Sequence, residues 1–555
     1  MEKIMNREIC IYCAGVRGVR LYLYMKEHGI NISFFGDVSP ERHGLIVDGV
    51  LCRSYESIIG GNKDIIIIVA NAKPQTIITS FKKHGFKYVF TDDEAINCFI
   101  DVNKNNCNIG NITKIEEIRR VKMDLLKLFA HLKNKYRSVA PNNGKLKILQ
   151  INYTDLPGHV FDGYDLMNDL NRLLGYDVKQ IVARKVSDSN TVIPILDNYI
   201  ARTCADFYET KFGVSNLFPL TGDFIYKMNE YQEADLVHYH ILHNRFISLL
   251  DYSLLMNSKL SVWTIHDPWL VTGDCIYPLQ CAGWREGCLH CHTFKVGGAV
   301  SHGQEKFMWN LKKEVLQSIN PHIVVASSFM RKYLEQSPMT KHFQNIYEIP
   351  FGIKSQRFNL RNNARRKQEM GIPDDMITIG FRVTDNYVKG CKYIYEALRS
   401  LDLNGKIFLL VVGEGKLAPD IKCKYKYKEF GWLNDDQKLA SFMEGCDIFL
   451  MPSLAESFGV MAIEAMAAGC TVICFKNTVL EEITNSPHCG IAVNYKSSSE
   501  IARVLYELIH DTQIIAQRGR YSSAYVNKNY SYDDYVNKHK QLYEHLIQLQ
   551  QNNKV

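Results

Sequence analysis

The sequence predicts an α/β protein built on parallel sheets, and three observations support this fold class. Short apolar runs without polar alternation, such as DIFLM at 447–451 and TVICF at 471–475, are typical of parallel strands covered on both faces. Segments with helical spacing separate these runs, as in βαβ units. The alternation starts near residues 8, 146 and 376. We therefore expect three Rossmann-like units in one chain.

Length and composition indicate a large globular protein. The chain has 555 residues, which predicts three or four domains of ~150 residues each. Its hydrophobic content of 46% with 23% charged residues is usual for such proteins. The net charge of +7 favours anionic ligands or an anionic membrane surface, and it is too weak to indicate nucleic-acid binding.

The N-terminus and the cysteines indicate a cellular compartment. The first residues lack the layout of a signal peptide, and no apolar run reaches the ~20 residues that span a bilayer. The 16 cysteines are scattered, and Cys10, Cys13 and Cys474 fall in predicted strands. This pattern fits buried thiols in a reducing compartment better than a disulfide framework. We expect a cytoplasmic protein, with peripheral contact at the inner face of the cell membrane left open.

Residues 1–95 are predicted to form a small Rossmann-like accessory module. The turn CAGVRG at 13–18 has the outline of the dinucleotide fingerprint G-x-G-x-x-G, with Cys13 in place of the first glycine. Asp37 ends the second strand, where a ribose-binding acid would lie. The alternative, which we favour, is a Rossmann-shaped module without a dinucleotide, and we assign it no chemistry.

Residues 96–145 are predicted to be a helical connector. Apolar residues recur at helical spacing between 115 and 132, with basic residues on the opposite face. Such a helix could lie on a membrane surface. Packing on its own domain is the commoner outcome and the one we expect. Further along, residues 184–233 show no regular pattern and are expected to be irregular.

The most informative stretch runs from 442 to 473 and contains a strand, a loop and a helix. The helix is expected over about 457–468, with Gly459 in its first turn and Gly469 as its C-terminal cap. A helix N-terminus behind a parallel strand binds anions through free N–H groups and the helix dipole. Glu456 lies at the mouth of this site, and Glu464 lies about two turns deeper on a similar face. A phosphate between two carboxylates suits a nucleotide sugar, because the carboxylates can hold hydroxyls of ribose and hexose.

The motif E-S-F-G-x-x-x-x-E at 456–464, followed by A-M-A-A-G at 465–469, is similar to the E-x7-E element of retaining GT-B glycosyltransferases, notably glycosyltransferase family 4. The alternative is an ordinary βαβ unit whose glutamates are solvated. The resemblance implies a GT-B fold over 146–555, in which two Rossmann-like domains face a cleft. One departure is Thr471, which stands where the family often has proline, and it affects strand geometry more than chemistry.

Further motifs follow in the order that the family has. His266, at the end of the predicted strand 260–267, matches the histidine that contacts the donor sugar. Arg382 and Lys389 match the residues that bind the donor pyrophosphate, where fixed cations stabilise the developing charge of the leaving group. V-V-G-x-G at 411–415 brings Gly413 and Gly415 near the nucleotide, and the chain at 431–433 is expected to pass the base.

A loop before the helix at 164 matches the family's glycine-rich loop only in part. It reads GHVFDG instead of the commoner Gly-Gly pair, so Gly158 and Gly163 are its candidates for contact with the donor phosphates. Nearby, three histidines follow one strand: His238, His240 and His243. They could suggest a metal, but we prefer packed imidazoles on a polar cleft wall, because no carboxylate pair completes a metal shell.

Four cysteines lie within seventeen residues of the segment after His266: Cys275, Cys281, Cys288 and Cys291. The run resembles a branch of family 4 proteins in bacterial polysaccharide clusters. Four thiolates could hold a structural zinc. Alternatively, they are free thiols in a loop on the acceptor side. Neither possibility indicates a catalytic metal, and no cofactor is expected to be required.

The predicted domains are an accessory module at 1–95, a connector at 96–145, an acceptor-side GT-B domain at 146–352, a donor-side GT-B domain at 353–530 and a C-terminal helix at 531–555 that crosses back. The resemblance implies transfer of a hexose, with retention, from a nucleoside diphosphate sugar to a hydroxyl of a sugar or polyprenyl-linked acceptor in capsule or O-antigen synthesis. It assigns catalytic roles to His266, Glu456, Arg382 and Lys389. Donor contacts are expected from Gly158, Arg382, Lys389, Gly413, Glu456, Ser457, Phe458, Gly459, Val460 and Glu464. Two alternatives stay open: a GT-B nucleotide-sugar epimerase, and a non-catalytic nucleotide-sugar-binding subunit of a transferase complex.

Overall fold

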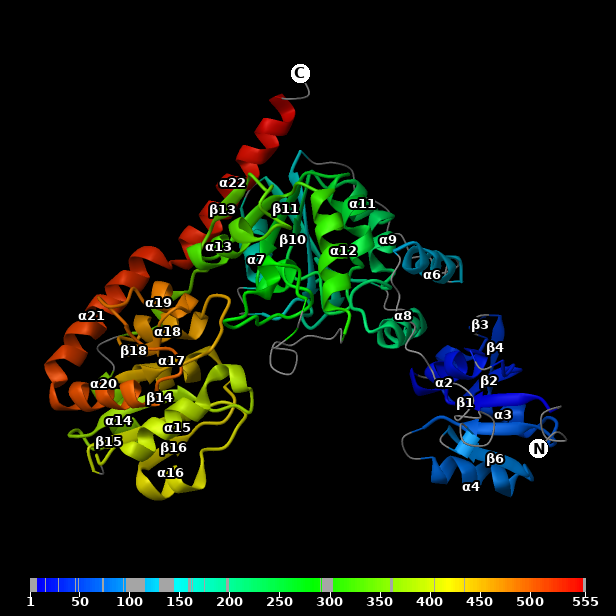
Figure 1. Ribbon diagram of the computed structural model, residues 1–555, viewed down its shortest axis with the longest axis horizontal. Helices are drawn as coiled ribbons and strands as arrows, with labels where there is room; N and C mark the ends of the chain where they lie inside the picture. The colour runs from blue at the N-terminus through cyan, green and yellow to red at the C-terminus, as the bar shows by residue number, and fades with distance from the viewer. Residues whose placement is uncertain are drawn as a thin grey trace.

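The computed structural model describes residues 7–552, apart from 15, 28, 45, 48, 72–73, 93, 96–114, 129–143, 158–160, 162, 174, 196–198, 290, 292–302, 360–362, 404 and 434. Its strands form three sheets, one each in an N-terminal module, a middle unit and a C-terminal unit. Figure 1 shows the middle unit, in cyan to green, between the blue N-terminal module and the yellow to red C-terminal unit. The prediction of an α/β protein with parallel sheets is confirmed.

The N-terminal sheet has the strand order β3-β4-β2-β1-β5-β6. All its pairs are parallel except the short β3–β4 pair at one edge. The strands are β1 (Ile9–Tyr12), β2 (Phe34–Asp37), β3 (Ile46–Val47), β4 (Val50–Ser54), β5 (Ile66–Val69) and β6 (Tyr88–Thr91). The helices are α2 (Val16–Glu27), α3 (Tyr55–Ile59) and α4 (Gln75–Lys83).

The middle sheet is parallel throughout, in the order β13-β12-β11-β10-β7-β8-β9. Its strands are β7 (Leu146–Thr154), β8 (Tyr176–Arg184), β9 (Val192–Pro194), β10 (Leu236–Tyr239), β11 (Ser261–Ile265), β12 (His322–Val325) and β13 (Ile346–Glu348). Its helices are α7 (Tyr164–Asn171), α8 (Tyr199–Phe212), α9 (Thr221–Tyr226), α10 (Asn229–Gln232), α11 (Tyr252–Met256), α12 (Glu305–Gln317) and α13 (Ser328–Gln336).

The prediction that residues 184–233 are irregular is wrong. This stretch contains β9 and the helices α8, α9 and α10. The buried face of α8 includes small residues, Ala201, Cys204 and Ala205, which give a weak apolar period. These small side chains let α8 pack against α2 of the N-terminal module. The helix was missed because its core face is made of residues that carry little hydrophobic signal.

The C-terminal sheet is also parallel, in the order β16-β15-β14-β17-β18-β19. Its strands are β14 (Ile377–Arg382), β15 (Ile407–Val412), β16 (Lys426–Glu429), β17 (Ile448–Leu450), β18 (Thr471–Phe475) and β19 (Ile491–Val493). Its helices are α14 (Asn363–Glu369), α15 (Cys391–Ser400), α16 (Pro419–Lys424), α17 (Asp436–Glu444), α18 (Val460–Ala467), α19 (Val479–Ile483), α20 (Ser498–His510) and α21 (Thr512–Asn529).

The last helix, α22 (Tyr532–Asn552), leaves the C-terminal unit and packs against the middle unit, as Figure 1 shows in red. The Tyr543 hydroxyl lies 2.6 Å from Nδ1 of His238 on β10, and Tyr176 of β8 donates to Glu544 at 2.6 Å. A second contact joins the two units, because Glu482 of α19 accepts hydrogen bonds from the amide and hydroxyl of Ser328 at the start of α13. The two units therefore meet through buried and charged contacts.

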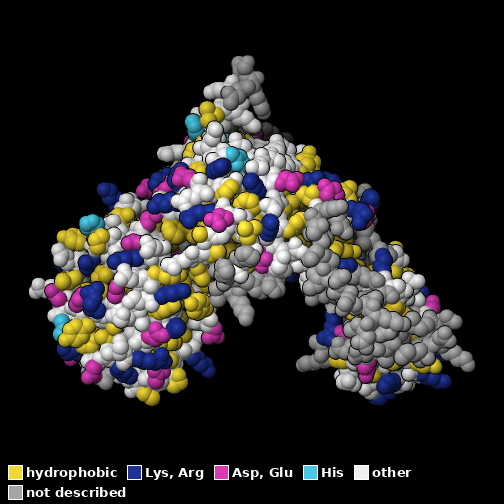
Figure 2. All heavy atoms as spheres, in the orientation of Figure 1, with side chains coloured by type: hydrophobic (Ala, Val, Ile, Leu, Met, Phe, Trp, Pro, Cys, Tyr) yellow, Lys and Arg dark blue, Asp and Glu magenta, His cyan; other side chains and the backbone are white. Residues whose placement is uncertain are grey.

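The connector helix α6 (Ile115–Leu128) packs on the chain itself. Ile118 and Leu125 are buried in the same apolar cluster as the middle unit, and buried Lys122 pairs with buried Asp251. Its apolar face is thus already covered. No helix in the described part of the chain is long and apolar enough to cross a membrane. On the face drawn in Figure 2, the coloured basic and acidic side chains are intermixed.

Candidate active site

The carboxyl ends of β14 and β17 bring two predicted residues into contact. Lys389 ends a short 3-10 turn (Tyr387–Lys389) after β14, and Glu456 lies in the loop after β17. The ammonium of Lys389 lies 2.6 Å from Oε1 of Glu456, which also accepts a hydrogen bond from the hydroxyl of Ser453 at 3.0 Å. Both side chains are largely buried, at 22% and 12% exposure. A cation and a carboxylate are therefore held together at the edge of the sheet where ligands of open α/β sheets bind.

Arg382, the last residue of β14, has partners that the sequence did not indicate. Its guanidinium donates to both carboxylate oxygens of Glu414 at 3.1 Å and lies 5.0 Å from the centre of the exposed Trp432 ring. Glu414 also accepts a hydrogen bond from Thr384 at 2.5 Å. Glu414 is the variable residue of V-V-G-x-G, and Trp432 lies in the segment expected to pass the base. Sequence spacing alone could not show that both meet Arg382.

The helix after Glu456 starts later than predicted. It is α18 (Val460–Ala467), and Gly459 is its N-cap with a φ of +100° instead of a residue of its first turn. A right-handed helix cannot include that conformation, so residues 457–459 form a loop. A side chain at 459 would also meet Leu480 at 2.4 Å. The amide groups of residues 457–459 donate to no described hydrogen-bond acceptor, as an anion site requires.

Phe458 contributes to this loop through its backbone. Its side chain is 1% exposed and packs edge-on against Phe351 and Tyr530, with ring centres 5.2 and 5.7 Å apart. Phe351 in turn stacks on His266 at 5.7 Å. These rings connect the loop before α18 to the histidine of the middle unit.

Glu464 lies on α18 in a half-buried position. Burial raises its pKa to about 7, with nearby Asp436 raising it further and Arg357 opposing. Arg357 and Asp436 form an ion pair of 2.7 Å with each other. A carboxyl group whose pKa lies close to neutral can accept or donate a hydrogen bond to a ligand hydroxyl.

His266 follows β11 and is 8% exposed. Burial lowers its pKa to about 4, so the imidazole is neutral at pH 7. Its Nε2 lies 3.3 Å from Nδ1 of His240, while its Nδ1 has no hydrogen-bond partner among the described residues. His240 thus lies beside His266 and positions its ring. In the sequence analysis, His240 was considered together with His238 and His243 and not with His266.

The other two histidines of β10 and its following loop have different partners. His238 is held between the hydroxyls of Tyr543 and Thr264, at 2.6 and 2.7 Å. His243 lies 3.1 Å from Asp267 and stacks on a tryptophan. Burial alone would raise the pKa of Asp267, but His243 holds it below its usual value.

Two of the candidate glycines, Gly413 and Gly163, have a positive φ. Gly413 follows β15 with a φ of +123°, and a side chain there would meet the carbonyl oxygen of Val383 at 2.3 Å. Gly163 precedes α7 with a φ of +74°, and a side chain there would meet Gln150 and His240. The predicted contact of Gly158 lies outside the described residues.

The four-cysteine segment was predicted either to hold a structural zinc or to contain free thiols. Among the described residues, which include all four of these cysteines, no group of three or more His, Cys, Asp or Glu could hold a metal ion.

In the N-terminal module, buried Asp37 accepts hydrogen bonds from the amides of Ala14 and Ser39 and from Arg42. Its carboxylate is thus used to fix the turn after β1, where Cys13 has a φ of +75°.

Comparison with known proteins shows what this chain is similar to. Residues 362–524 match the sequence profile of the family described as glycosyl transferases group 1. An uncharacterized glycosyltransferase of Methanocaldococcus jannaschii is 26% identical over 163 residues, which cover 28% of this chain and 45% of that protein. The O-antigen biosynthesis glycosyltransferase WclY of Escherichia coli is 32% identical over 111 residues, covering 19% of this chain and 31% of that one. The chain therefore spans less than half the length of these two relatives.

Solved structures share the architecture of the middle and C-terminal units. A sucrose-phosphate synthase from Thermosynechococcus elongatus aligns with a TM-score of 0.54 at 16% identity, over 73% of this chain and 100% of its own. WaaG, a glycosyltransferase involved in lipopolysaccharide biosynthesis, aligns with a TM-score of 0.50 at 15% identity, over 70% of this chain and 97% of its own. At these identities the likeness concerns the fold, and it confirms the predicted GT-B architecture.

Proposed function

We propose that the protein is a retaining glycosyltransferase of family 4 type, which moves a hexose from a nucleoside diphosphate sugar to a hydroxyl of a sugar or lipid-linked acceptor. The observation that carries the proposal is the Lys389–Glu456 pair beside the open N-terminus of α18. The similarity of residues 362–524 to group 1 glycosyl transferases supports it. WclY is named as an O-antigen biosynthesis glycosyltransferase, and this name supports our proposal that the product is a cell-surface polysaccharide, either capsule or O-antigen.

The donor diphosphate would bind at the loop before α18. The amide groups of residues 457–460 and the cations Arg382 and Lys389 would neutralise its charge, because helix N-termini and fixed cations favour phosphate. Gly413 leaves room for the nucleotide. Glu464 would hold the ribose, and the exposed Trp432 ring offers a surface for the base.

Transfer would occur in the cleft between the middle and C-terminal units. The acceptor oxygen forms a bond to the anomeric carbon on the same face from which the phosphate oxygen departs, and the acceptor proton passes to that oxygen. Arg382 and Lys389 stabilise the negative charge that grows on the diphosphate. Glu456 would hold hydroxyls of the transferred sugar. His266 would act across the cleft as a neutral hydrogen-bonding group, since burial keeps its pKa near 4.

The domain roles follow from this arrangement. Residues 353–530 would bind the donor, residues 146–352 would bind the acceptor, and residues 1–95 would be an accessory module. A polyprenyl-linked acceptor would bring the protein to the inner face of the cell membrane. Two other functions would use the same nucleotide site: epimerisation of a nucleotide sugar, and binding without turnover in support of a partner transferase.

Release of nucleoside diphosphate separates these functions. UDP-, GDP- and dTDP-sugars are incubated with the full chain, with and without a lipid-linked sugar, for the wild type, Glu464→Ala and the exposed control Glu507→Ala. Acceptor-dependent release that only Glu464→Ala abolishes supports the transferase. Release of UDP without acceptor, together with an epimerised sugar, would favour the epimerase. Tight binding without release in every arm would contradict catalysis.

A further inference from the structure

A pocket adjoins Glu456 on the side formed by the four-cysteine segment. It spans about 420 Å³ of space between protein atoms, which includes open solvent. One wall comes from the middle unit, from the segment 276–280 and α13. The other comes from the C-terminal unit, from the loop 454–456, the start of α19 and Tyr495. The pocket therefore lies between the two units, directly beside the carboxylate that the proposed function assigns to the transferred sugar.

Tyr277 is the lining residue with the clearest relation to the site. Burial raises the pKa of its phenol, and Lys389, Glu456 and Asp267 all act on it electrostatically. The side chains of Tyr277 and Leu279 pack against the apolar cluster of the C-terminal unit, although both residues belong to the middle unit. No hydrogen bond from the Tyr277 hydroxyl is found among the described residues. A donor and acceptor group is thus presented beside the Lys389–Glu456 pair.

The segment that carries Tyr277 is firmly held. The hydroxyl of Thr272 donates to the carbonyl oxygen of Cys275 at 2.7 Å. Fully buried Lys312 donates to the carbonyl oxygens of Trp269 and Thr272 at 2.7 and 3.1 Å, and its ammonium lies 3.5 Å from the centre of the Trp269 ring. These bonds fix the start of the segment, so Tyr277 has a defined position.

The charge of the pocket restricts its ligand. Glu456 is the one charged residue among the described lining residues, and the others are apolar, aromatic or neutral polar side chains. Tyrosine rings pack well on the faces of pyranose rings, since both surfaces are flat and partly apolar. A carboxylate placed here would meet no cation in the lining, because the neighbouring Lys389 is already paired with Glu456 at 2.6 Å, and a carboxylate without a partner is costly.

We propose that this pocket holds the far edge of the transferred sugar, that the sugar is neutral, and that Tyr277 determines its specificity. This inference rests on the proposed function. It predicts that a neutral hexose or an acetamido sugar enters the pocket and that a uronic acid is rejected. The hydroxyl of Tyr277 and the second oxygen of Glu456 would bind its outer hydroxyls.

Calorimetry with paired ligands tests the proposal. For UDP, GDP and dTDP, the dissociation constant of the diphosphate is compared with those of its glucose, N-acetylglucosamine and glucuronic acid esters, where these exist. The full chain is used as wild type, Tyr277→Ala, Tyr277→Phe and Gln280→Arg. The control is Tyr521→Ala, an exposed tyrosine on α21.

The expected wild-type result is a preference for the neutral sugar over the uronic acid of ~100-fold, since an unpaired buried carboxylate costs several kcal/mol. Tyr277→Ala should weaken the neutral-sugar nucleotide ~10-fold and leave the bare diphosphate within about two-fold, as loss of one aromatic packing partner implies. Tyr277→Phe should weaken binding of the neutral-sugar nucleotide less than Tyr277→Ala does. Gln280→Arg, which adds a cation to the exposed rim, should improve binding of the uronic acid.

The outcomes separate the two ideas. If a diphosphate binds but the uronic acid binds as tightly as the neutral sugar, or if Tyr277→Ala leaves neutral-sugar binding unchanged, this inference is overturned and the proposed function stands. If no nucleoside diphosphate binds in any arm, the proposed function fails and the inference fails with it.

Discussion

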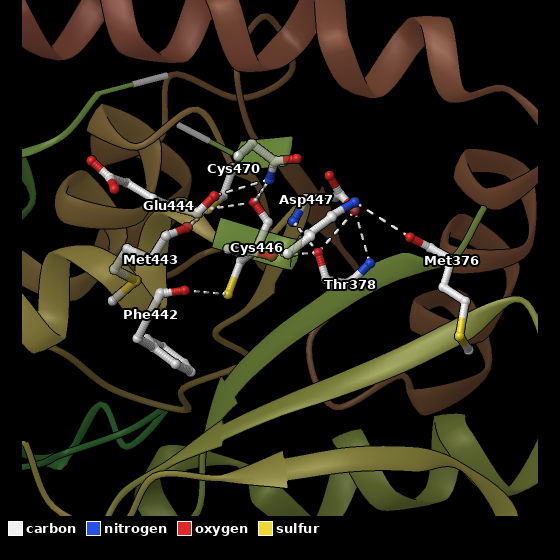
Figure 3. A network of polar contacts seen from close by, with 11 residues as sticks. Met376, Thr378, Phe442, Met443, Glu444, Cys446, Asp447 and Cys470 are labelled. Carbon is white, nitrogen blue, oxygen red and sulfur yellow. Dashed lines mark hydrogen bonds and ion pairs between the residues drawn. The ribbon is translucent and has the colours of Figure 1, made fainter. Parts of the chain in front are cut away.

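Strand β17 has acidic side chains at both ends, and the two ends use them differently. Before its amino end, Asp447 accepts three hydrogen bonds on one oxygen. One comes from Lys367 at 2.5 Å. The other two come from the amide and hydroxyl of Thr378 at 2.8 and 2.9 Å (Figure 3). After its carboxyl end, Glu456 accepts side-chain bonds from Lys389 and Ser453, and the amides of the next residues are open. The first arrangement joins chain segments, whereas the second faces the cleft.

A candidate site differs from a structural ion pair in the groups around its carboxylate. Glu444, near Asp447, is 2% exposed and takes the amide of Asn359 and the guanidinium of Arg366, both at 2.8 Å. If charge and burial alone defined a candidate site, the amino end of β17 would therefore be chosen. The carboxyl end is distinguished by backbone donors without acceptors and by a pocket beside the carboxylate. Variants at the two ends should thus separate activity from stability.

The largest expected effect is that of Lys389→Met on turnover. Removing a cation that stabilises the departing diphosphate should lower kcat by ~100- to 1,000-fold, by analogy with the loss of one group that stabilises transition-state charge. Diphosphate release at saturating donor measures this, with urea unfolding as the companion measurement. The matched control is Lys392→Met, an exposed lysine one turn away on α15. Equal losses in both variants would contradict a specific role for Lys389.

Next in size is the effect of Asp447→Ala on stability. The substitution leaves buried Lys367 without its carboxylate, which costs ~3 kcal/mol when one partner of a buried pair is removed. Urea unfolding should show this loss, while the folded fraction keeps its donor affinity. Asp420→Ala, which breaks an exposed pair with Arg399, should cost less than ~1 kcal/mol. A loss of donor binding by folded Asp447→Ala would show that both ends of β17 act in donor binding, and it would contradict the distinction between them.

Sequence patterns could predict the sheets and the order of the site motifs, because both are local. Strand β15 is an uninterrupted apolar run, β18 is apolar after Thr471, and Glu456 and Glu464 lie within one short stretch. The partners of these residues could not be predicted in the same way. Lys389 meets Glu456 across 67 positions, and Arg382 meets Glu414 across 32 positions.

Two other misses have physical causes. The start of α18 was misplaced because Gly459 has a positive φ in the folded chain, which the letter G alone does not reveal. Tyr277 was overlooked because the cysteines around it drew attention to metal binding. Its contact with the C-terminal unit depends on how the two units meet, which no local pattern encodes.

The third effect concerns Glu464 and pH. Its pKa is about 7 in the folded protein against an ordinary 4.5, so the folded state binds the proton more tightly than the unfolded state. Stability should therefore fall as pH rises from about 4.5 to 7, by up to ~1.4 kcal/mol per pH unit, and level off above. Glu464→Gln should remove this slope, so its melting temperature relative to wild type should rise between pH 5 and pH 7. A parallel shift in the exposed control Glu507→Gln would refute the assignment.

The smallest effect is expected from Cys470→Ala at the amino end. The thiol of Cys470 donates to the carbonyl oxygens of Met443 and Cys446 at 3.3 and 3.4 Å (Figure 3), and thiols are weak donors. Loss of a small buried group should lower the free energy of unfolding by ~1 kcal/mol and leave turnover unchanged. Urea unfolding and diphosphate release measure the two quantities. If Cys470→Ala cost as much as Asp447→Ala, packing around the sulfur, and not the charged hydrogen bonds to Asp447, would hold this end of the sheet.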